Sequence, residues 1–216
     1  LDLEELGSAV MSVQPLSTAG ATDGSLPVPL PETFAEDITL FRGQSQKQPH
    51  GRVFGGQVLA QGVIACGRTV RTIEGGADRR LHSLHAYFMR PGDDTQPITF
   101  SVERMRDGRS FSTRRVHAIQ HGKPILSMSA SFQDPDGGLD HQDPFPETPD
   151  PASVPSLSEL FAGVDHPSAR HLAEGRAIEQ RHVEGNLFVT PATEQVADQR
   201  VWMRANGTLP DDPLVH

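Results

Sequence analysis

The 216-residue chain contains a single cysteine, Cys66, together with one tryptophan and one tyrosine. With one cysteine, an internal disulfide is impossible and a zinc site of four thiolates is excluded. No apolar run approaches the roughly 20 residues that a helix needs to cross a bilayer. The first 13 residues hold acids but no lysine or arginine, so they lack the basic start of a secretory signal. These absences favour a cytoplasmic protein without a membrane span.

Basic residues are outnumbered, because 19 Lys and Arg stand against 28 Asp and Glu and leave a net charge of -9. This balance argues against a general nucleic-acid-binding protein. The charge is uneven: residues 52–123 hold 12 basic and 6 acidic residues, and the rest of the chain holds 7 basic and 22 acidic residues. A basic module in an acidic chain suits a small anionic ligand, although a solvated strand face explains the same arginines equally well.

A stripe of small and apolar residues at helical spacing predicts one helix over residues 54–70. Val58, Gly62 and Cys66 lie on this stripe. Glycine weakens an isolated helix, so its presence indicates a sheet that approaches the helix backbone closely. Cys66 should then be a small core residue, buried between the helix and the sheet.

Four strands are expected after this helix, because polar and apolar residues alternate in four segments separated by turn signals. The segments are residues 81–90, 98–106, 110–120 and 124–133. Asp107-Gly108 is a strong hairpin signal between the second and third of them. One helix packed on an antiparallel sheet is an α+β unit.

Composition divides the chain into four regions. Residues 1–37 are expected to form an N-terminal segment, with a short helix at Leu3–Val10 and a flexible linker at 12–33 that is rich in Pro, Gly and Ser. The α+β unit occupies residues 38–142. The remaining regions are a linker with short helices over 143–176 and the start of a second unit over 177–216, which includes predicted strands at 178–183 and 200–204.

Several motifs in a fixed order resemble those of a known family. Over residues 41–142 they read FRGQ, RVFGGQVLAQGVIACGRTV, HSLHAYFMRPGD, VERMRDGRSFSTRRVHAIQHGKPILSMSASFQ and DHQ. Each motif alone is weak, but their order is specific. The chain resembles the first half of the type II acyl-CoA thioesterases, and VWMRANG followed by PDD resembles the start of that family's second half. The resemblance implies an α+β double hotdog, in which each unit is a central helix wrapped by a curved antiparallel sheet, with the second unit incomplete in this chain.

The resemblance also implies an activity, the hydrolysis of fatty acyl-CoA to free fatty acid and coenzyme A. It implies acyl-CoA as the substrate, a homo-oligomer, and no cofactor or metal. In this family an Asp on the second central helix, a Ser or Thr on a strand and a Gln on a late strand orient the attacking water. None of these positions is matched in this chain, so the catalytic residues are expected after His216.

The first unit offers candidate substrate-binding residues. Gly55, Gly56 and Gln57 open the predicted helix, where free backbone N–H groups can stabilise an oxyanion. Gln57 can hold a water or a carbonyl group, but it lacks the carboxylate of a general base. His82 and His85 are candidate pocket residues, for which a structural role is more common than a basic one. Three residues apart on a strand, they face opposite sides and are poorly placed to share a metal.

Arg109 and Ser110 complete the candidate set. Five arginines between residues 104 and 115 could bind the phosphates of coenzyme A, because the guanidinium fork matches phosphate geometry. Gly108–Ser112 is a partial match to the nucleophile elbow of serine hydrolases, but its last position is not glycine and a hairpin surrounds it, so that class is disfavoured.

Two other functions stay open from the sequence. One is a non-catalytic hotdog module that binds acyl thioesters. The other, less favoured, is a hotdog enoyl-thioester hydratase, whose usual Asp/His pair on a helix is not seen. Fold alone does not separate these functions from hydrolysis.

Overall fold

The computed structural model describes residues 2–13, 34–173, 177–185 and 197–216. The chain divides into two compact units, Leu1–Gly137 and Gly138–Val215. In the first unit, strands β1 (Leu3–Val13) and β2 (Phe34–Gly43) precede helix α1 (Gly55–Arg71) and the short helix η1 (Gly76–Asp78). Four strands follow: β3 (Arg80–Phe88), β4 (Ile98–Asp107), β5 (Phe111–Gln120) and β6 (Lys123–Gln133).

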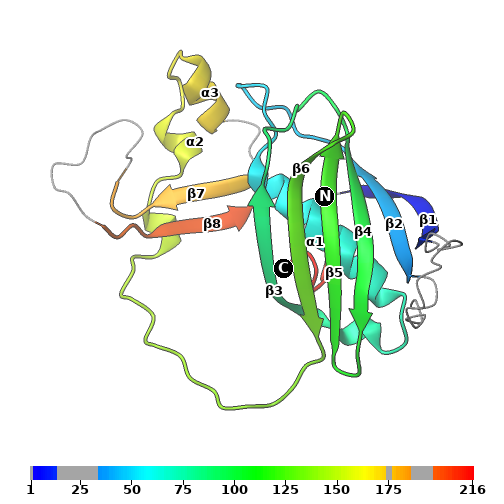
Figure 1. Ribbon diagram of the computed structural model, residues 1–216. Helices are drawn as coiled ribbons and strands as arrows, with labels where there is room; N and C mark the ends of the chain where they lie inside the picture. Colours follow the sequence, from blue (N-terminus) through cyan, green and yellow to red (C-terminus); the bar gives the residue numbers. More distant parts are fainter. Residues whose placement is uncertain (1, 14–33, 174–176, 186–196) are drawn as a thin grey trace, which may run out of the picture. The chain divides into compact units, whose positions relative to one another are not determined.

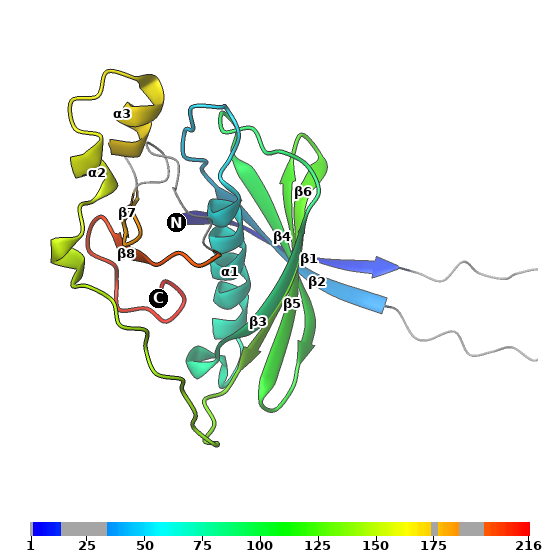
Figure 2. The same ribbon diagram turned by 90° about the vertical axis from the view of Figure 1, so that its left-hand side faces the viewer.

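The six strands form one sheet in the order β1-β2-β4-β5-β6-β3, with every neighbouring pair antiparallel. Helix α1 lies along one face of this sheet (Figure 1, Figure 2). The helix and the four strands from β3 to β6 confirm the elements that the sequence predicts, with ends that differ by at most two residues. The first unit is therefore the expected α+β hotdog arrangement.

Small residues of α1 allow the helix backbone to approach the sheet. A side-chain carbon added to Gly62 would lie 3.1 Å from the Met128 Cε atom and 3.6 Å from a Val116 methyl group. Cys66 is fully buried and faces the same core. Its burial raises the pKa of the thiol to about 12, because a thiolate loses its hydration in an apolar interior. The predicted burial of Cys66 is confirmed.

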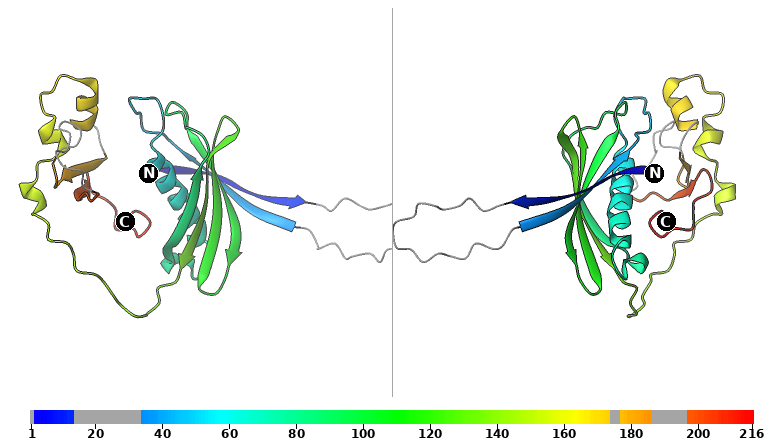
Figure 3. Two further views of the ribbon diagram at one scale, coloured as in Figure 1. Left: turned by 60° about the vertical axis from the view of Figure 1, so that its left-hand side comes forward. Right: turned by 90° about the vertical axis from the view of Figure 1, so that its right-hand side faces the viewer.

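The predicted helix at Leu3–Val10 is wrong, because these residues belong to strand β1. They pair with β2 in the register Leu3↔Gly43 to Val13↔Phe34, with a bulge between Glu5 and Gly7. The two strands lie side by side at one edge of the sheet (Figure 3). Pairing with a distant strand thus overrides the local helical pattern, and the predicted boundary at residue 37 falls inside β2. Residues 14–33 of the predicted linker lie outside the described residues.

Strand β3 forms the other edge of the sheet and has a neighbour, β6, on one side only. Its apolar side chains are largely exposed, with Leu84 at 42%, Tyr87 at 65% and Phe88 at 58%. Alternation along the sequence predicted this strand correctly, but it did not indicate that both of its faces would be open.

The second unit contains a short helical part and a two-stranded sheet. Its elements are η2 (Pro151–Ser153), α2 (Leu157–Leu160), α3 (Pro167–Ala173), β7 (Ile178–His182) and β8 (Val201–Ala205). Strands β7 and β8 confirm the two strands predicted at 178–183 and 200–204, and they pair antiparallel. A small apolar cluster of Leu157, Phe161 and Ala169 joins the two helices.

The segment before η2 is attached to β8 of the same unit. The Trp202 indole Nε1–H donates to the Pro149 carbonyl oxygen at 3.0 Å, and the Phe145 ring stacks on Trp202 with centroids 6.1 Å apart. These contacts fix the path of a segment that composition alone marks as a linker. In the part of the chain that the structure describes, none of the helices has the length and apolar character of a membrane span.

Cys66 provides a test of this fold. At pH 8 we expect iodoacetamide to alkylate the folded chain more than about 100-fold more slowly than the urea-unfolded chain, because a buried thiol with a raised pKa forms little thiolate. A matched control replaces Cys66 with serine and carries Ser129→Cys on the exposed face of β6, where alkylation should be fast without urea. Equal rates for folded and unfolded Cys66 would contradict the packing of α1 on the sheet.

Candidate functional site

An apolar cleft of about 470 Å³ lies at the N-terminal end of α1. Val53, Gly55 and Val58 line it from the helix side, and Phe88 lines it from the end of β3. The turn that follows β3 and the start of β6 complete the wall. Apolar walls that converge on a helix start are suited to hold an apolar ligand with a polar group at the helix end.

The helix start, which lines the cleft through Gly55, has unpaired backbone donors. Phe54 is the N-cap residue and makes no side-chain cap, and the first turn contains no acidic residue. Within the described residues, the N–H groups of Gly55 and Gly56 have no acceptor. Gly55 brings the helix start close to Phe88, since an added side-chain carbon would lie 3.0 Å from the Phe88 ring. The positive end of the helix dipole and two free N–H groups can therefore receive a carbonyl oxygen or an anion.

The Gln57 side chain is engaged by the loop before the helix. Its amide Nε2 donates to the Gln44 carbonyl oxygen at 2.7 Å, and its Oε1 accepts from the Gln46 N–H at 3.1 Å. Gln61, one turn further along, donates to the same Gln44 oxygen at 3.0 Å. Gln57 thus fastens the loop to α1, and a role for it in holding water or substrate stays a prediction.

His82 and His85 lie on β3, outside the lining of the cleft. The His82 ring packs edge-on against Phe111 at 5.8 Å between centroids, and the His85 ring against Tyr87 at 4.7 Å. Both side chains are exposed. The structure therefore does not bring these histidines together with the glycines at the helix start.

Arg109 and Ser110 lie in the hairpin between β4 and β5. The carbonyl oxygen of Arg109 accepts from the Arg79 guanidinium at 2.8 Å, and that of Ser110 accepts from the Asp134 N–H at 3.0 Å. This hairpin approaches the C-terminal end of α1, about 20 Å along the helix from Gly55 at 1.5 Å per residue. The predicted binding residues therefore occupy two separate regions of the first unit.

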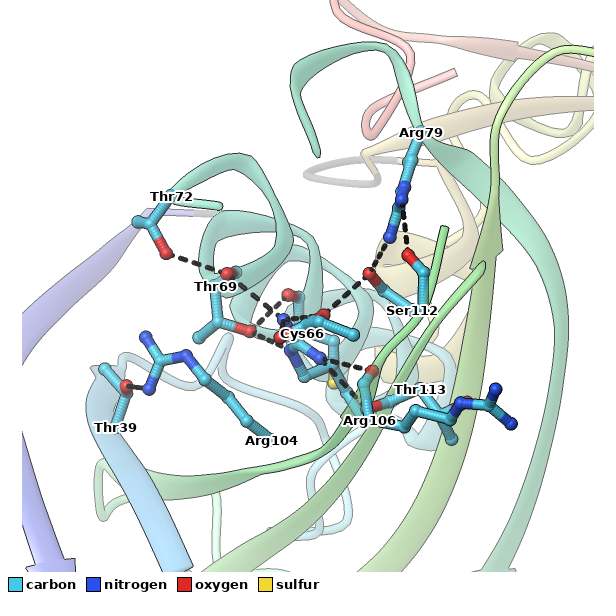
Figure 4. A network of polar contacts seen from close by, with 12 residues as sticks. Thr39, Cys66, Thr69, Thr72, Arg79, Arg104, Arg106, Ser112 and Thr113 are labelled. Atoms are coloured by element: carbon cyan, nitrogen blue, oxygen red, sulfur yellow. Dashed lines mark hydrogen bonds and ion pairs between the residues drawn. The ribbon is translucent and has the colours of Figure 1, made fainter. Parts of the chain in front are cut away.

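A buried polar network, which the sequence did not reveal, joins this hairpin to α1 (Figure 4). The Arg114 side chain is fully buried, and its Nε–H donates to the Thr69 hydroxyl at 2.8 Å. Its Nη2 lies 2.8 Å from a carboxylate oxygen of Asp107. Burial lowers the pKa of Arg114, an effect that Asp107 opposes. A cation at the negative end of the helix dipole is a stabilising arrangement.

Arg79 extends the network to the end of β6. Its guanidinium donates to Asp134 Oδ1 at 2.9 Å and to the Ser112 hydroxyl at 2.6 Å, and this hydroxyl donates to Asp107 at 2.7 Å. Two further arginines proposed for coenzyme A phosphates also have partners: Arg104 donates to Thr39 Oγ1 at 2.9 Å, and Arg115 pairs with Glu103 at 3.4 Å. These contacts favour a structural role for Arg104, Arg114 and Arg115.

Arg90 is the charged residue that lines the cleft, and sequence reasoning did not single it out. Its Nη1 donates to the Pro124 carbonyl oxygen at 2.8 Å. Its motif, Arg-Pro-Gly-Asp, entered the sequence analysis as a turn and as part of the family resemblance, and no binding role was assigned to Arg90. The cleft forms only when α1, β3 and β6 are assembled. No group of three or more His, Cys, Asp or Glu side chains within the described ranges is arranged to hold a metal ion.

The network permits a matched test of stability on one strand. Arg114→Met should lower the free energy of unfolding of the first unit by about 2–4 kcal/mol, because it leaves Asp107 and Thr69 without their buried partner. Arg115→Met, its neighbour on the opposite face with a side chain 44% exposed, should cost less than about 1 kcal/mol. The free energy of unfolding of each variant is measured from the urea dependence of Cys66 alkylation. Similar losses for the two variants would show that the network contributes no more than a surface ion pair.

Comparisons with known proteins agree with this arrangement. Residues 44–133 match the family described as the acyl-CoA thioesterase N-terminal domain. The chain is 37% identical over 179 residues to acyl-CoA thioesterase 2 of Haemophilus influenzae, covering 82% of this chain and 61% of that protein. It is 44% identical over 126 residues to human acyl-coenzyme A thioesterase 8, covering 58% of this chain and 38% of that protein.

Solved structures show the same similarity. The acyl-CoA thioesterase II TesB2 of Mycobacterium marinum matches with a TM-score of 0.59 and 37% identity, over 82% of this chain and 59% of that one. The tesB protein of Mycobacterium avium subspecies paratuberculosis matches with a TM-score of 0.60 and 33% identity, over 82% and 58%. The chain spans at most about three fifths of the length of these relatives. Residues 44–133 therefore belong to the family of acyl-CoA thioesterase N-terminal domains, and over the matched part the chain is similar to type II acyl-CoA thioesterases.

Proposed function

We propose that the protein containing this chain is an acyl-CoA thioesterase, which hydrolyses fatty acyl-CoA to free fatty acid and coenzyme A. The observation that carries the proposal is the apolar cleft at the glycine start of α1 in a chain of this family. The walls of the cleft are suited to methylene groups. The free N–H groups of Gly55 and Gly56 are suited to bind the carbonyl oxygen of a thioester.

Hydrolysis also needs a group that removes a proton from the attacking water. Among the described residues, none of those lining the cleft carries a carboxylate or an imidazole. We therefore propose that the water is activated by an Asp, a Ser or Thr and a Gln that are not part of this chain. In this proposal the first unit contributes binding surface and the oriented amides of α1.

The proposal includes the cellular compartment, the metabolic role and the oligomeric state of the enzyme. We place it in the cytoplasm, in fatty acid metabolism, and as a homo-oligomer. The lone buried cysteine fits a reducing compartment, and the relatives carry thioesterase names.

One observation favours a second candidate, a module that binds acyl thioesters without cleaving them. The cleft combines apolar walls, free amides and a guanidinium, yet the described residues that line it include no general base. Such a site has what binding requires and lacks what proton transfer requires.

Release of free thiol from one long-chain acyl-CoA separates these candidates. The 216-residue chain should be at least about 100-fold slower than the longest polypeptide that its reading frame encodes, since a general base contributes about 10²–10⁴ in rate. Equal turnover would place catalysis in the first unit and direct attention to Gln57, His82 and His85. Turnover by neither polypeptide, with acyl-CoA still bound, would support the binding module.

A further inference from the structure

The mouth of the α1 cleft carries a guanidinium with unused hydrogen-bonding capacity. Arg90 lines the cleft and uses its Nη1 on the Pro124 carbonyl oxygen. The structure shows no carboxylate paired with Arg90 in the ranges it describes, and the other N–H groups of the guanidinium have no acceptor there. The forked donors of an arginine match phosphate oxygens, and the charge persists at every physiological pH.

Two more cations, Arg52 and Lys123, lie on segments that are connected to the lining of the cleft by hydrogen bonds. The Val53 N–H donates to the Gly92 carbonyl oxygen at 2.9 Å, and Arg52 forms a β-bridge with Asp93. Arg52 and Lys123 are both exposed, and neither side chain has an ion pair with a described residue. Since Lys123 precedes Pro124, which Arg90 contacts, three unpaired cations gather at this end of the unit.

The carboxylates of the same end are occupied by other groups. The Asp94 side chain is buried, accepts from the Gln48 N–H at 2.7 Å and lies 3.6 Å from Lys47 Nζ. Asp93 Oδ1 accepts from the N–H and the hydroxyl of Thr95, and these hydrogen bonds lower the pKa of Asp93. Neither carboxylate lines the cleft, and the lowered pKa makes Asp93 a weak base.

We propose that the α1 cleft of the first unit binds a phosphate-bearing thioester and does not hydrolyse it, with Arg90 contacting a phosphate and the free amides of Gly55 and Gly56 facing the thioester carbonyl. The acyl group occupies the apolar wall formed by Val58 and Phe88. This inference rests on the proposed function only for the identity of the ligand as a coenzyme A thioester; the binding and the absence of turnover follow from the residues of the cleft.

Isothermal titration of the 216-residue chain with two ligands tests the proposal. Hexanoyl-CoA carries phosphates, whereas hexanoyl-pantetheine carries the same thioester without them. Arg90→Gln should weaken hexanoyl-CoA binding about tenfold, as expected for loss of a charge-assisted contact, and leave hexanoyl-pantetheine binding unchanged. Wild-type affinity for hexanoyl-CoA should also fall as salt rises. Gly55→Val, which fills the helix end of the cleft, should weaken both ligands.

The matched control is Arg80→Gln, at the opposite end of β3, which should bind both ligands like the wild type. Resistance of Cys66 to alkylation confirms that each variant is folded. Unchanged binding of hexanoyl-CoA by Arg90→Gln, or equal weakening of both ligands, overturns the phosphate contact. Release of coenzyme A by the 216-residue chain at the rate of the longer polypeptide overturns the absence of turnover. If the longer polypeptide fails to hydrolyse acyl-CoA while the binding results are as expected, the proposed thioesterase function is refuted and the proposed binding site is still supported.

Discussion

The close approach of α1 to the sheet is the constraint on which the first unit depends. At Gly62 there is room for hydrogen but little for a methyl group, because Met128 and Val116 occupy the facing space. Cys66, one turn later, is fully enclosed. A larger residue at Gly62 would require the Met128 side chain or the helix to shift, and α1 carries the buried arginine contacts at one end and the cleft at the other.

The two ends of α1 have different chemistry as a result. At the C-terminal end, Arg114 satisfies the Thr69 hydroxyl in a buried network that also engages Asp107. At the N-terminal end, Gly55 and Gly56 leave their N–H groups unpaired in the described structure. The helix dipole favours a cation at the first place and an anion at the second. One end is thus fixed by the protein's own residues, and the other is open to a ligand.

The sequence predicted the elements whose signal is local. Alternation and turn residues located β3 to β6, and the small-residue stripe located α1, because each pattern is complete within its own segment. It failed for β1, whose hydrogen-bonding partner β2 is separated from it by residues 14–33.

The candidate site was harder to predict, because its residues also come from segments that are distant in the sequence. Arg114 occupies an inward position of β5, but its acceptors Thr69 and Asp107 come from other elements. Arg90 can be identified as a candidate binding residue only when α1, β3 and β6 are assembled and form the cleft that it lines. The glycines at the helix start were found because a helix terminus has unpaired N–H groups wherever it occurs.

The two edges of the six-stranded sheet differ in the features that protect an edge from pairing with a further strand. The β1 edge carries the exposed carboxylates of Glu4 and Glu5 and is distorted by the bulge at Gly7, features that oppose pairing with a further strand. The β3 edge is regular over most of its length and exposes Leu84, Tyr87 and Phe88. By the same rule, β3 is the less protected of the two edges against pairing with a further strand.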